Sequence, residues 1–298
     1  MRLVPAASIA AVLVFAACSN ADNGRLTPAG PEYARVQDLE GTPDLIVDGK
    51  RLADSWVIYD QNLDASLCSV QEGGVTPGVR RVLRFTVTTP NIGDADVFVG
   101  DPLAHMDPNG DGDFSDSDGL FEFATCHNHF HFRHYATYEL LDLNGKVWKA
   151  AKRGFCMLDI TPWQFDGGVT SWVYRRCGTK TVHGFQGISV GYADTYFKWL
   201  GGQYFVLDGG DGQAVVPPGQ YMLRITVNPP FVAKGKEPCP HVDPDGFCHQ
   251  LLESRYDNNV AEVLITIPDH PGKTGFGPGG GQDPQAEIID DENRPDKT

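Results

Sequence analysis

The chain of 298 residues carries 39 acidic against 24 basic side chains, which gives a formal net charge of −15. This balance argues against a nucleic-acid-binding protein, because phosphate backbones require a positive surface. A negative field attracts cations, including amines, but acidic surfaces also keep many exported proteins in solution. The charge therefore permits an amine substrate without requiring one.

The first 17 residues predict a signal peptide, because an apolar stretch follows Arg2 and is too short to span a membrane in a mature protein. Two alanines precede Cys18, which resembles the cleavage box of bacterial lipoproteins. We expect export, with Cys18 lipidated and the protein anchored in the periplasm or at the cell surface. The alternative is ordinary cleavage near Ala17 and secretion. No later segment has the run of about 18 apolar residues that a membrane helix needs, so we expect attachment through the lipid only.

The remaining chain divides into three parts by composition. Residues 18–38 are rich in Ala, Asn, Gly and Pro and predict a tether. Residues 39–268 form one expected folded domain. Residues 269–298 contain glycine-rich and acidic stretches without apolar periodicity, which predicts a disordered tail.

Apolar and polar residues alternate in short runs, clearest at residues 82–87, 221–227 and 260–267. This period of two predicts β-strands, and Gly and Pro punctuate the gaps between them. The expected fold is mainly β, a single β-sandwich-like domain with long loops. Seven cysteines are present, and setting Cys18 aside leaves six that can pair completely as disulfides.

A twelve-residue acidic stretch at 107–118 has the spacing of a calcium loop. Gly112 stands at position 6, and oxygen-bearing side chains occupy positions 1, 3, 5, 7, 9 and 12, namely Asp107, Asn109, Asp111, Asp113, Ser115 and Asp118. Such a pattern resembles the loops of EF-hand or dockerin proteins. The alternative is a solvated acidic turn, since flanking helices are not evident.

Three histidines alternate with other residues in the run Cys126-His127-Asn128-His129-Phe130-His131. On an extended segment their side chains share one face, with neighbours about 6.6 Å apart along the backbone. Three neutral imidazoles suit Cu(II), Zn(II) or Ni(II) and leave positions open for a reactant. A hydrogen-bonded histidine cluster without metal is the alternative, and His134 fits the spacing less well.

This run, with Tyr138-Glu139-Leu140-Leu141-Asp142 and Lys152-Arg153-Gly154-Phe155-Cys156 after it, resembles the catalytic domain of the lysyl oxidase family. Later segments follow the same pattern: Gly187-Ile188-Ser189, Asp194-Thr195-Tyr196, Pro218-Gly219-Gln220-Tyr221, Val227-Asn228-Pro229 and Tyr256-Asp257-Asn258-Asn259. The similarity covers about residues 40–268 and is loose before about residue 119.

The resemblance implies a copper site at His127, His129 and His131, and a lysine tyrosylquinone cofactor formed from Lys152 and Tyr196. The implied reaction uses molecular oxygen to deaminate a primary amine, including lysine in a protein, to an aldehyde with release of hydrogen peroxide and ammonia. His134 and Asp159 are candidates for the base. Without the resemblance, Lys152 would read as a solvated lysine and Tyr196 as a strand aromatic.

The resemblance also implies a disulfide between Cys126 and Cys177. Cys239 and Cys248 are nine residues apart and are expected to pair locally, which leaves Cys68 and Cys156 as a possible third bridge.

A second, structural calcium site is implied at Asp44, Leu45, Glu253, Asn258 and Asn259. Arg255 stands where an acid is expected, and Asp257 is the residue that could compensate.

Two other functions remain open on sequence. Three histidines and a water also make the centre of a zinc hydrolase. A non-enzymatic surface lipoprotein that binds copper or calcium is the second alternative. Phe121, Phe123 and Ala124 stand where animal members of the family have tryptophans and a histidine, so substrate specificity does not carry over.

Overall fold

The structure is a computed structural model that describes residues 41–152, 154–163, 173–234 and 239–281. The predicted signal peptide, lipidated Cys18 and tether lie outside these residues and stay predictions. Within the described ranges no helix is both long and apolar enough to cross a membrane.

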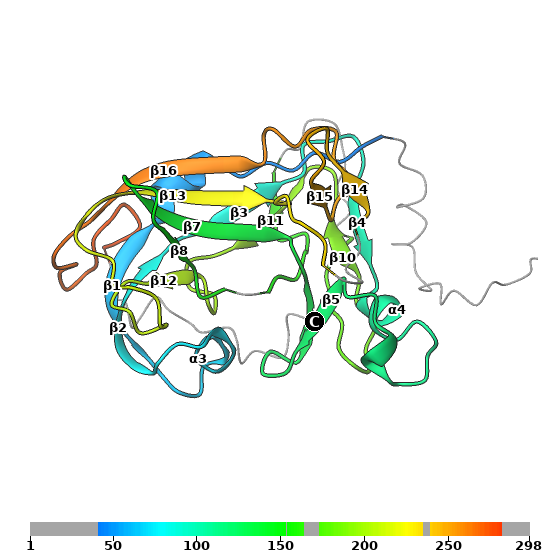
Figure 1. Cartoon of the computed structure of the whole chain (residues 1–298), viewed down its shortest axis with the longest axis horizontal. Helices are drawn as coiled ribbons and strands as arrows, with labels where there is room; N and C mark the ends of the chain where they lie inside the picture. The colour runs from blue at the N-terminus through cyan, green and yellow to red at the C-terminus, as the bar shows by residue number, and fades with distance from the viewer. Residues whose placement is uncertain (1–40, 153, 164–172, 235–238, 282–298) are drawn as a thin grey trace, which may run out of the picture.

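Strands dominate the described chain, which confirms the expected mainly β fold (Figure 1). The helical elements are short: α2 (Gly49–Ser55), α3 (Cys68–Gly73), α4 (Pro102–Met106) and the 3-10 turn η1 (Phe114–Asp116). The strands are β1 (Val57–Leu63), β2 (Gly78–Arg84), β3 (Val87–Pro90), β4 (Val97–Gly100), β5 (Phe121–Ala124), β6 (His129–Phe132), β7 (Ala136–Asp142), β8 (Val147–Lys149), β9 (Thr161–Pro162), β10 (Gln186–Ile188), β11 (Tyr192–Tyr196), β12 (Tyr204–Val206), β13 (Gly219–Val227), β14 (His241–Val242), β15 (Cys248–His249) and β16 (Val260–Ile267).

The largest sheet among the described residues has the strand order β16-β13-β7-β8. In β13 the alternate residues Tyr221, Leu223, Ile225 and Val227 are buried, as the period of two predicted. The predicted strand at 260–267 coincides with β16. The predicted strand at 82–87 is divided instead, because β2 ends at Arg84 and β3 begins at Val87.

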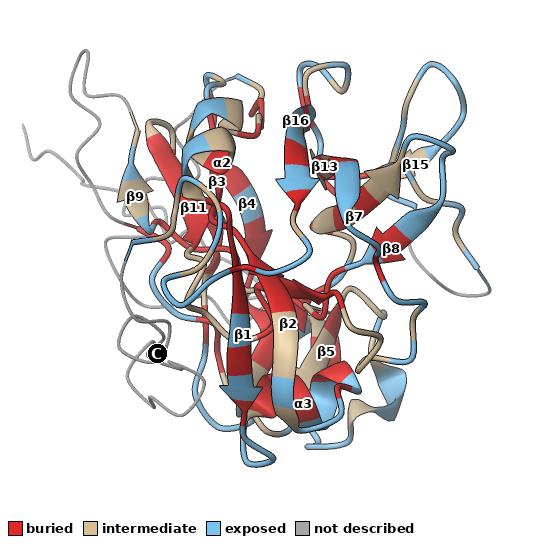
Figure 2. Ribbon diagram, turned by 90° about the vertical axis from the view of Figure 1, so that its left-hand side faces the viewer, coloured by how far each residue is buried: buried red, intermediate tan, exposed pale blue. Residues whose placement is uncertain are grey.

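Two smaller sheets, β1-β2-β12 and β3-β11-β9, lie across the core from this sheet and give the sandwich-like arrangement (Figures 1 and 2). Tyr138 of β7 packs edge-on against Phe85 and Phe155, with ring centroids 5.3 and 5.4 Å away. Aromatic packing of this kind adds to the burial of apolar area in holding the layers together. Strand β11 belongs to one of the two smaller sheets, and its last residue, Tyr196, is buried in this core.

The beginning of the segment expected to be a disordered tail packs on the domain. Phe276 forms a β-bridge with Ile58, its ring lies 6.1 Å from that of Trp56, and Gly279 donates to the Trp56 carbonyl at 3.0 Å. Gly277 has a φ of +129°, where its hydrogen fits against Trp56 and a side chain would not. These contacts join the described beginning of this segment to β1 and to the residue before it. Residues 282–298 lie outside the described part.

The disulfides differ from the expected pairing in two of three cases. Cys239 and Cys248 pair as predicted. Cys126 pairs with Cys68 rather than with Cys177, and Cys156 pairs with Cys177 rather than with Cys68. The reason is local: the turn after β5 directs Cys126 toward α3, which begins at Cys68.

Candidate metal and cofactor site

The three histidines lie on one hairpin but not on one strand. Strands β5 and β6 pair from Phe121↔Phe132 to Ala124↔His129, and the chain turns between them. Asn128 closes the turn with a φ of +56°, and its N–H donates to the Ala124 carbonyl at 2.8 Å. His129 and His131 belong to β6, whereas His127 comes from the turn. The expected extended run is thus bent, which lets all three rings approach one another.

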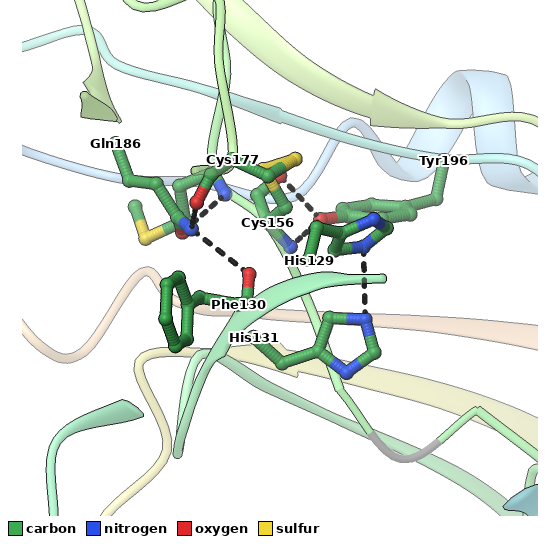
Figure 3. The surroundings of a disulfide bond; sticks show 8 residues. His129, Phe130, His131, Cys156, Cys177, Gln186 and Tyr196 are labelled. Atoms are coloured by element: carbon green, nitrogen blue, oxygen red, sulfur yellow. Dashed lines mark hydrogen bonds between the residues drawn. A yellow bond between two sulfur atoms is a disulfide. The ribbon is translucent and has the colours of Figure 1, made fainter. Parts of the chain in front are cut away.

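The rings of His127, His129 and His131 converge, with centroids 4.9 to 5.5 Å apart. The Nε2 atoms of His129 and His131 are separated by 3.1 Å and face each other (Figure 3). Two nitrogens bound to one ion at about 2.0–2.1 Å are about 2.8–3.4 Å apart for angles between square and tetrahedral. His129 and His131 therefore fit a shared ion. Among the described residues, no group of three His, Cys, Asp or Glu has the arrangement of a metal site.

Burial and neighbouring charge favour the neutral form of two of these imidazoles. The pKa of His131 is held well below its usual value by burial first and then by His129, Lys152 and His127. Burial and Lys152 also lower the pKa of His127, while Glu72 acts in the opposite direction. The neutral imidazole is the form that binds a metal.

The backbone at Gly154 lies directly against His131. A Cβ at this position would be 2.0 Å from Nδ1 and 2.4 Å from Cγ of the imidazole. The bridge between Phe132 and Phe155 sets this close approach by pairing β6 with the segment after Lys152. Only glycine allows the two segments to meet here.

The structure brings Lys152 and Tyr196 together from 44 residues apart in sequence (196 − 152). Lys152 Nζ lies 4.8 Å from the centroid of the Tyr196 ring. The hydroxyl of Tyr196 donates to the Cys156 carbonyl and accepts from the Cys156 N–H, both at 2.8 Å (Figure 3). The ring packs edge-on against Phe155, with centroids 5.2 Å apart. These contacts hold Tyr196 in one orientation with its ring presented to Lys152.

A carboxyl group lies behind this pair. Asp194 on β11 is 1% exposed, and its Oδ2 has no hydrogen-bond partner among the described residues. Burial raises the pKa of Asp194 well above its usual value, and the charge of Lys152 acts against the rise. The sequence singled out Asp194 as part of a motif without giving it a role.

His127, His131 and Lys152 border a cleft with a volume of about 370 Å³. The lining also contains two carboxylates and two small or aromatic wall residues, namely Glu72, Glu122, Phe123 and Ala124. Phe123 and Ala124 are among the positions where the family pattern differs, so their place in the wall agrees with an altered substrate entrance.

His134 and Asp159 are the two candidates for the base, and the contacts of neither residue give it a role in the reaction. His134 stacks on Phe231 with ring centroids 4.3 Å apart. Asp159 is 1% exposed and accepts hydrogen bonds from the N–H groups of Val173, Tyr174 and Ser189 and from the Ser189 hydroxyl. Asp159 therefore ties three segments together, which is a structural role.

The acidic loop at 107–118 turns its carboxylates onto its own backbone. Asp107 accepts from the N–H groups of Asp111 and Gly112 at 3.0 and 2.9 Å. Asp118, the expected last ligand, instead contacts His105 at 2.7 Å and accepts from the Leu120 N–H. These contacts lie within the loop and its neighbours, and calcium here stays a prediction.

The five residues of the second expected calcium site do come together. Glu253 accepts from the Leu45 N–H at 2.5 Å and from Asn259 Nδ2 at 2.8 Å, while Asn258 Nδ2 donates to Asp44 at 2.8 Å. The Oδ1 atoms of Asn258 and Asn259 are buried and have no hydrogen-bond partner among the described residues. Buried acceptors beside two carboxylates are the donor set that Ca²⁺ prefers.

Arg255 does not occupy this cluster as a bound cation. Its guanidinium pairs with the exposed Asp257, with Nε 2.9 Å from Oδ1. Asp257 thus pairs with Arg255 at the surface, and its replacement of the expected acid stays a prediction.

Comparison with known proteins gives one family. The lysyl oxidase family pattern matches residues 43–237. Lysyl oxidase homolog 2 of Homo sapiens is 27% identical over 255 residues, which are 81% of this chain and 27% of that protein. Lysyl oxidase homolog 1 of Homo sapiens is 29% identical over 260 residues, which are 83% of this chain and 37% of that protein. The chain therefore spans well under half the length of these relatives.

Sequence reasoning missed Glu72, Gly154 and Asp194. Gly154 and Asp194 stood inside recognised motifs, so their signal was present but unassigned. No motif in the sequence contained Glu72, because only the fold brings α3 to the histidine hairpin.

Proposed function

Because this chain belongs to the lysyl oxidase family, we propose that it is a copper-dependent amine oxidase that deaminates primary amines through a lysine tyrosylquinone cofactor. The observation that carries the proposal is the approach of Lys152 Nζ to within 4.8 Å of the Tyr196 ring centroid beside three converging imidazoles. A zinc hydrolase or a passive metal binder would give no reason for a lysine over a buried tyrosine ring.

His127, His129 and His131 would hold the copper ion, and Lys152 and Tyr196 would become the cofactor. Copper with molecular oxygen would supply the oxidation of the Tyr196 ring, and the resulting quinone would accept the two electrons that an amine loses, with hydrogen peroxide and ammonia released. No ordinary side chain forms a Schiff base with an amine and then takes two electrons from it, so the proposed reaction needs this group.

Residues of this chain hold the side chains of the proposed site in position. The Cys156 backbone fixes the hydroxyl of Tyr196, and the packing of Phe155 fixes its ring plane. The low pKa of His131 keeps its imidazole available as a ligand. The cleft beside Lys152 admits an amine, and the net charge of −15 attracts it as a cation. The substrate class is thus a primary amine, free or as lysine in a protein.

Mass spectrometry of the copper-loaded, aerobically purified protein tests the proposal. We expect a tryptic peptide that contains Lys152 joined covalently to one that contains Tyr196, with the mass change of quinone formation. If both peptides are separate and unmodified in protein that holds copper, the amine oxidase is excluded. A zinc-dependent hydrolysis or plain metal binding would then take its place.

We also propose a structural calcium ion at Asp44, Leu45, Glu253, Asn258 and Asn259. The support is the pair of buried, unpartnered Asn oxygens next to two carboxylates. Millimolar Ca²⁺ is expected to raise the melting temperature by several degrees, as any ligand that binds only the folded state does. Asn258→Ala removes one of these oxygens and is expected to reduce that rise, measured by calorimetry in Ca²⁺ and in EDTA.

The same cluster predicts a pH dependence of stability in EDTA. Burial, with a smaller effect of Asp44, raises the pKa of Glu253 from 4.5 to about 7. The folded state then binds a proton more tightly than the unfolded chain, so this contribution is complete below pH 4.5 and is lost as the pH rises through about 7. The loss should be about 1–3 kcal/mol. Urea unfolding between pH 4.5 and 8 should show it in the unchanged protein but not in Glu253→Gln, and equal pH profiles would contradict it.

We propose that the protein acts outside the cytoplasm. The three disulfides favour an oxidising compartment. The signal peptide and the lipid on Cys18 remain predictions from the sequence, and the mass of the mature amino terminus checks both.

A further inference from the structure

Glu72 of α3 contacts two consecutive groups of the histidine hairpin. Its Oε2 contacts Nδ1 of His127, and its Oε1 accepts the N–H of Cys126 at 2.6 Å. Both oxygens of one carboxylate are thus used on neighbouring residues. Cys126 is in addition joined to Cys68, the first residue of α3, by a disulfide. The short helix therefore fixes this corner of the hairpin by one covalent bond and two polar contacts.

The contact between Glu72 and His127 affects the orientation of the His127 ring more than it affects the stability of the fold. The side chains of His127 and Glu72 are 15% and 28% exposed, and partly exposed ion pairs contribute only about 0–1 kcal/mol to folding. His127 is also the ligand candidate that does not lie on β6, so β-pairing does not determine its ring position. A carboxylate that accepts the Nδ1 proton leaves Nε2 as the nitrogen with a free electron pair.

From these contacts we propose that Glu72 is the positioning residue of His127, which selects its Nε2 as the copper-binding nitrogen and holds that ring toward His129 and His131. The inference rests on the proposed copper site. Glu72 itself touches neither copper nor substrate in this role. Removal of such an outer partner typically weakens metal binding about 10–100-fold.

The test is the Cu(II) affinity of the full chain, measured by competition with a chromogenic chelator of known affinity. Glu72→Gln has the same shape but no charge and only one acceptor oxygen, so the acceptor for the Nδ1 proton of His127 is weakened or lost. We expect an affinity about 10–100-fold lower. Glu122→Gln is the matched control, because Glu122 lines the same cleft and forms an ion pair with Arg133 at 3.7 Å. It should change the affinity less than about twofold.

A second measurement separates positioning from general damage to the hairpin. In a His127→Ala background, Glu72→Gln should have no further effect on Cu(II) affinity, since the ring it positions is gone. An affinity of Glu72→Gln equal to that of the unchanged protein would overturn the inference, and so would a full effect that persists without His127. If copper binds as expected but no quinone forms, the amine oxidase proposal fails while the role of Glu72 stands. If the unchanged protein binds no copper, both fail.

Discussion

Lys152→Arg is expected to abolish both the quinone absorbance and the amine-dependent release of hydrogen peroxide. The guanidinium keeps the positive charge near the Tyr196 ring but stays protonated and cannot act as a nucleophile. No bond to the ring can then form, and the reaction loses its electron acceptor. Since enzymes accelerate reactions by about 10⁶-fold or more, we expect the rate to fall on the order of 10³-fold at least. The measurement is peroxide formation with a primary amine, alongside the visible spectrum.

The matched control for this change is Lys180→Arg. Lys180 Nζ lies 4.5 Å from the ring centroid of Phe123, so it is also a lysine above an aromatic ring near the hairpin. Its replacement should leave the absorbance and the rate close to those of the unchanged protein. Retention of quinone and activity in Lys152→Arg would show that Lys152 is not the cofactor lysine.

The elements that the sequence predicted correctly are those with a strong local signal. The alternation in β13 and β16 follows from one more buried and one more exposed face, whereas the pairing of these two strands is seen only in the structure. The prediction failed at 82–87, where buried Phe85 and Thr86 continue the apolar pattern through a point at which the chain leaves one sheet for another. A periodic pattern indicates which residues are buried. The residues before and after the break between β2 and β3 are both buried, so the pattern does not mark the break.

Site residues were predictable when a motif contained them and not when only the fold did. The spacing of the three histidines indicated a metal. The bend at Asn128 that makes the rings converge gives no periodic signal in the sequence. Glu72 reaches His127 across 55 positions of sequence, and no local pattern reports such a contact. The pairing of Cys126 with Cys177, which the resemblance implied, was wrong, and the pairing of Cys68 with Cys156 left over from it was wrong as well. Spacing indicated only the short bridge, because six cysteines allow fifteen pairings.

Gly154→Ala is expected to disrupt the metal site through a single methyl group. The new Cβ would lie 2.0 Å from His131 Nδ1, and His131 is 7% exposed, with little room to move. Either His131 leaves its position facing His129, or the bridge from Phe132 to Phe155 opens. Copper affinity should fall about 100-fold or more, since a lost ligand costs more than a lost outer partner.

The expected cost in folding stability is about 1–3 kcal/mol, as for other overpacked sites. Gly73→Ala is the control, because Gly73 lines the same cleft but its nearest contact for a Cβ is an ordinary 3.5 Å to the Ala151 carbonyl. Chelator competition and thermal unfolding on both variants separate the two effects. If Gly154→Ala binds copper like the unchanged protein, His131 cannot be a ligand in the orientation seen here. If Gly73→Ala loses copper as well, the cleft is sensitive to any added volume, and the specific clash at His131 is not the cause.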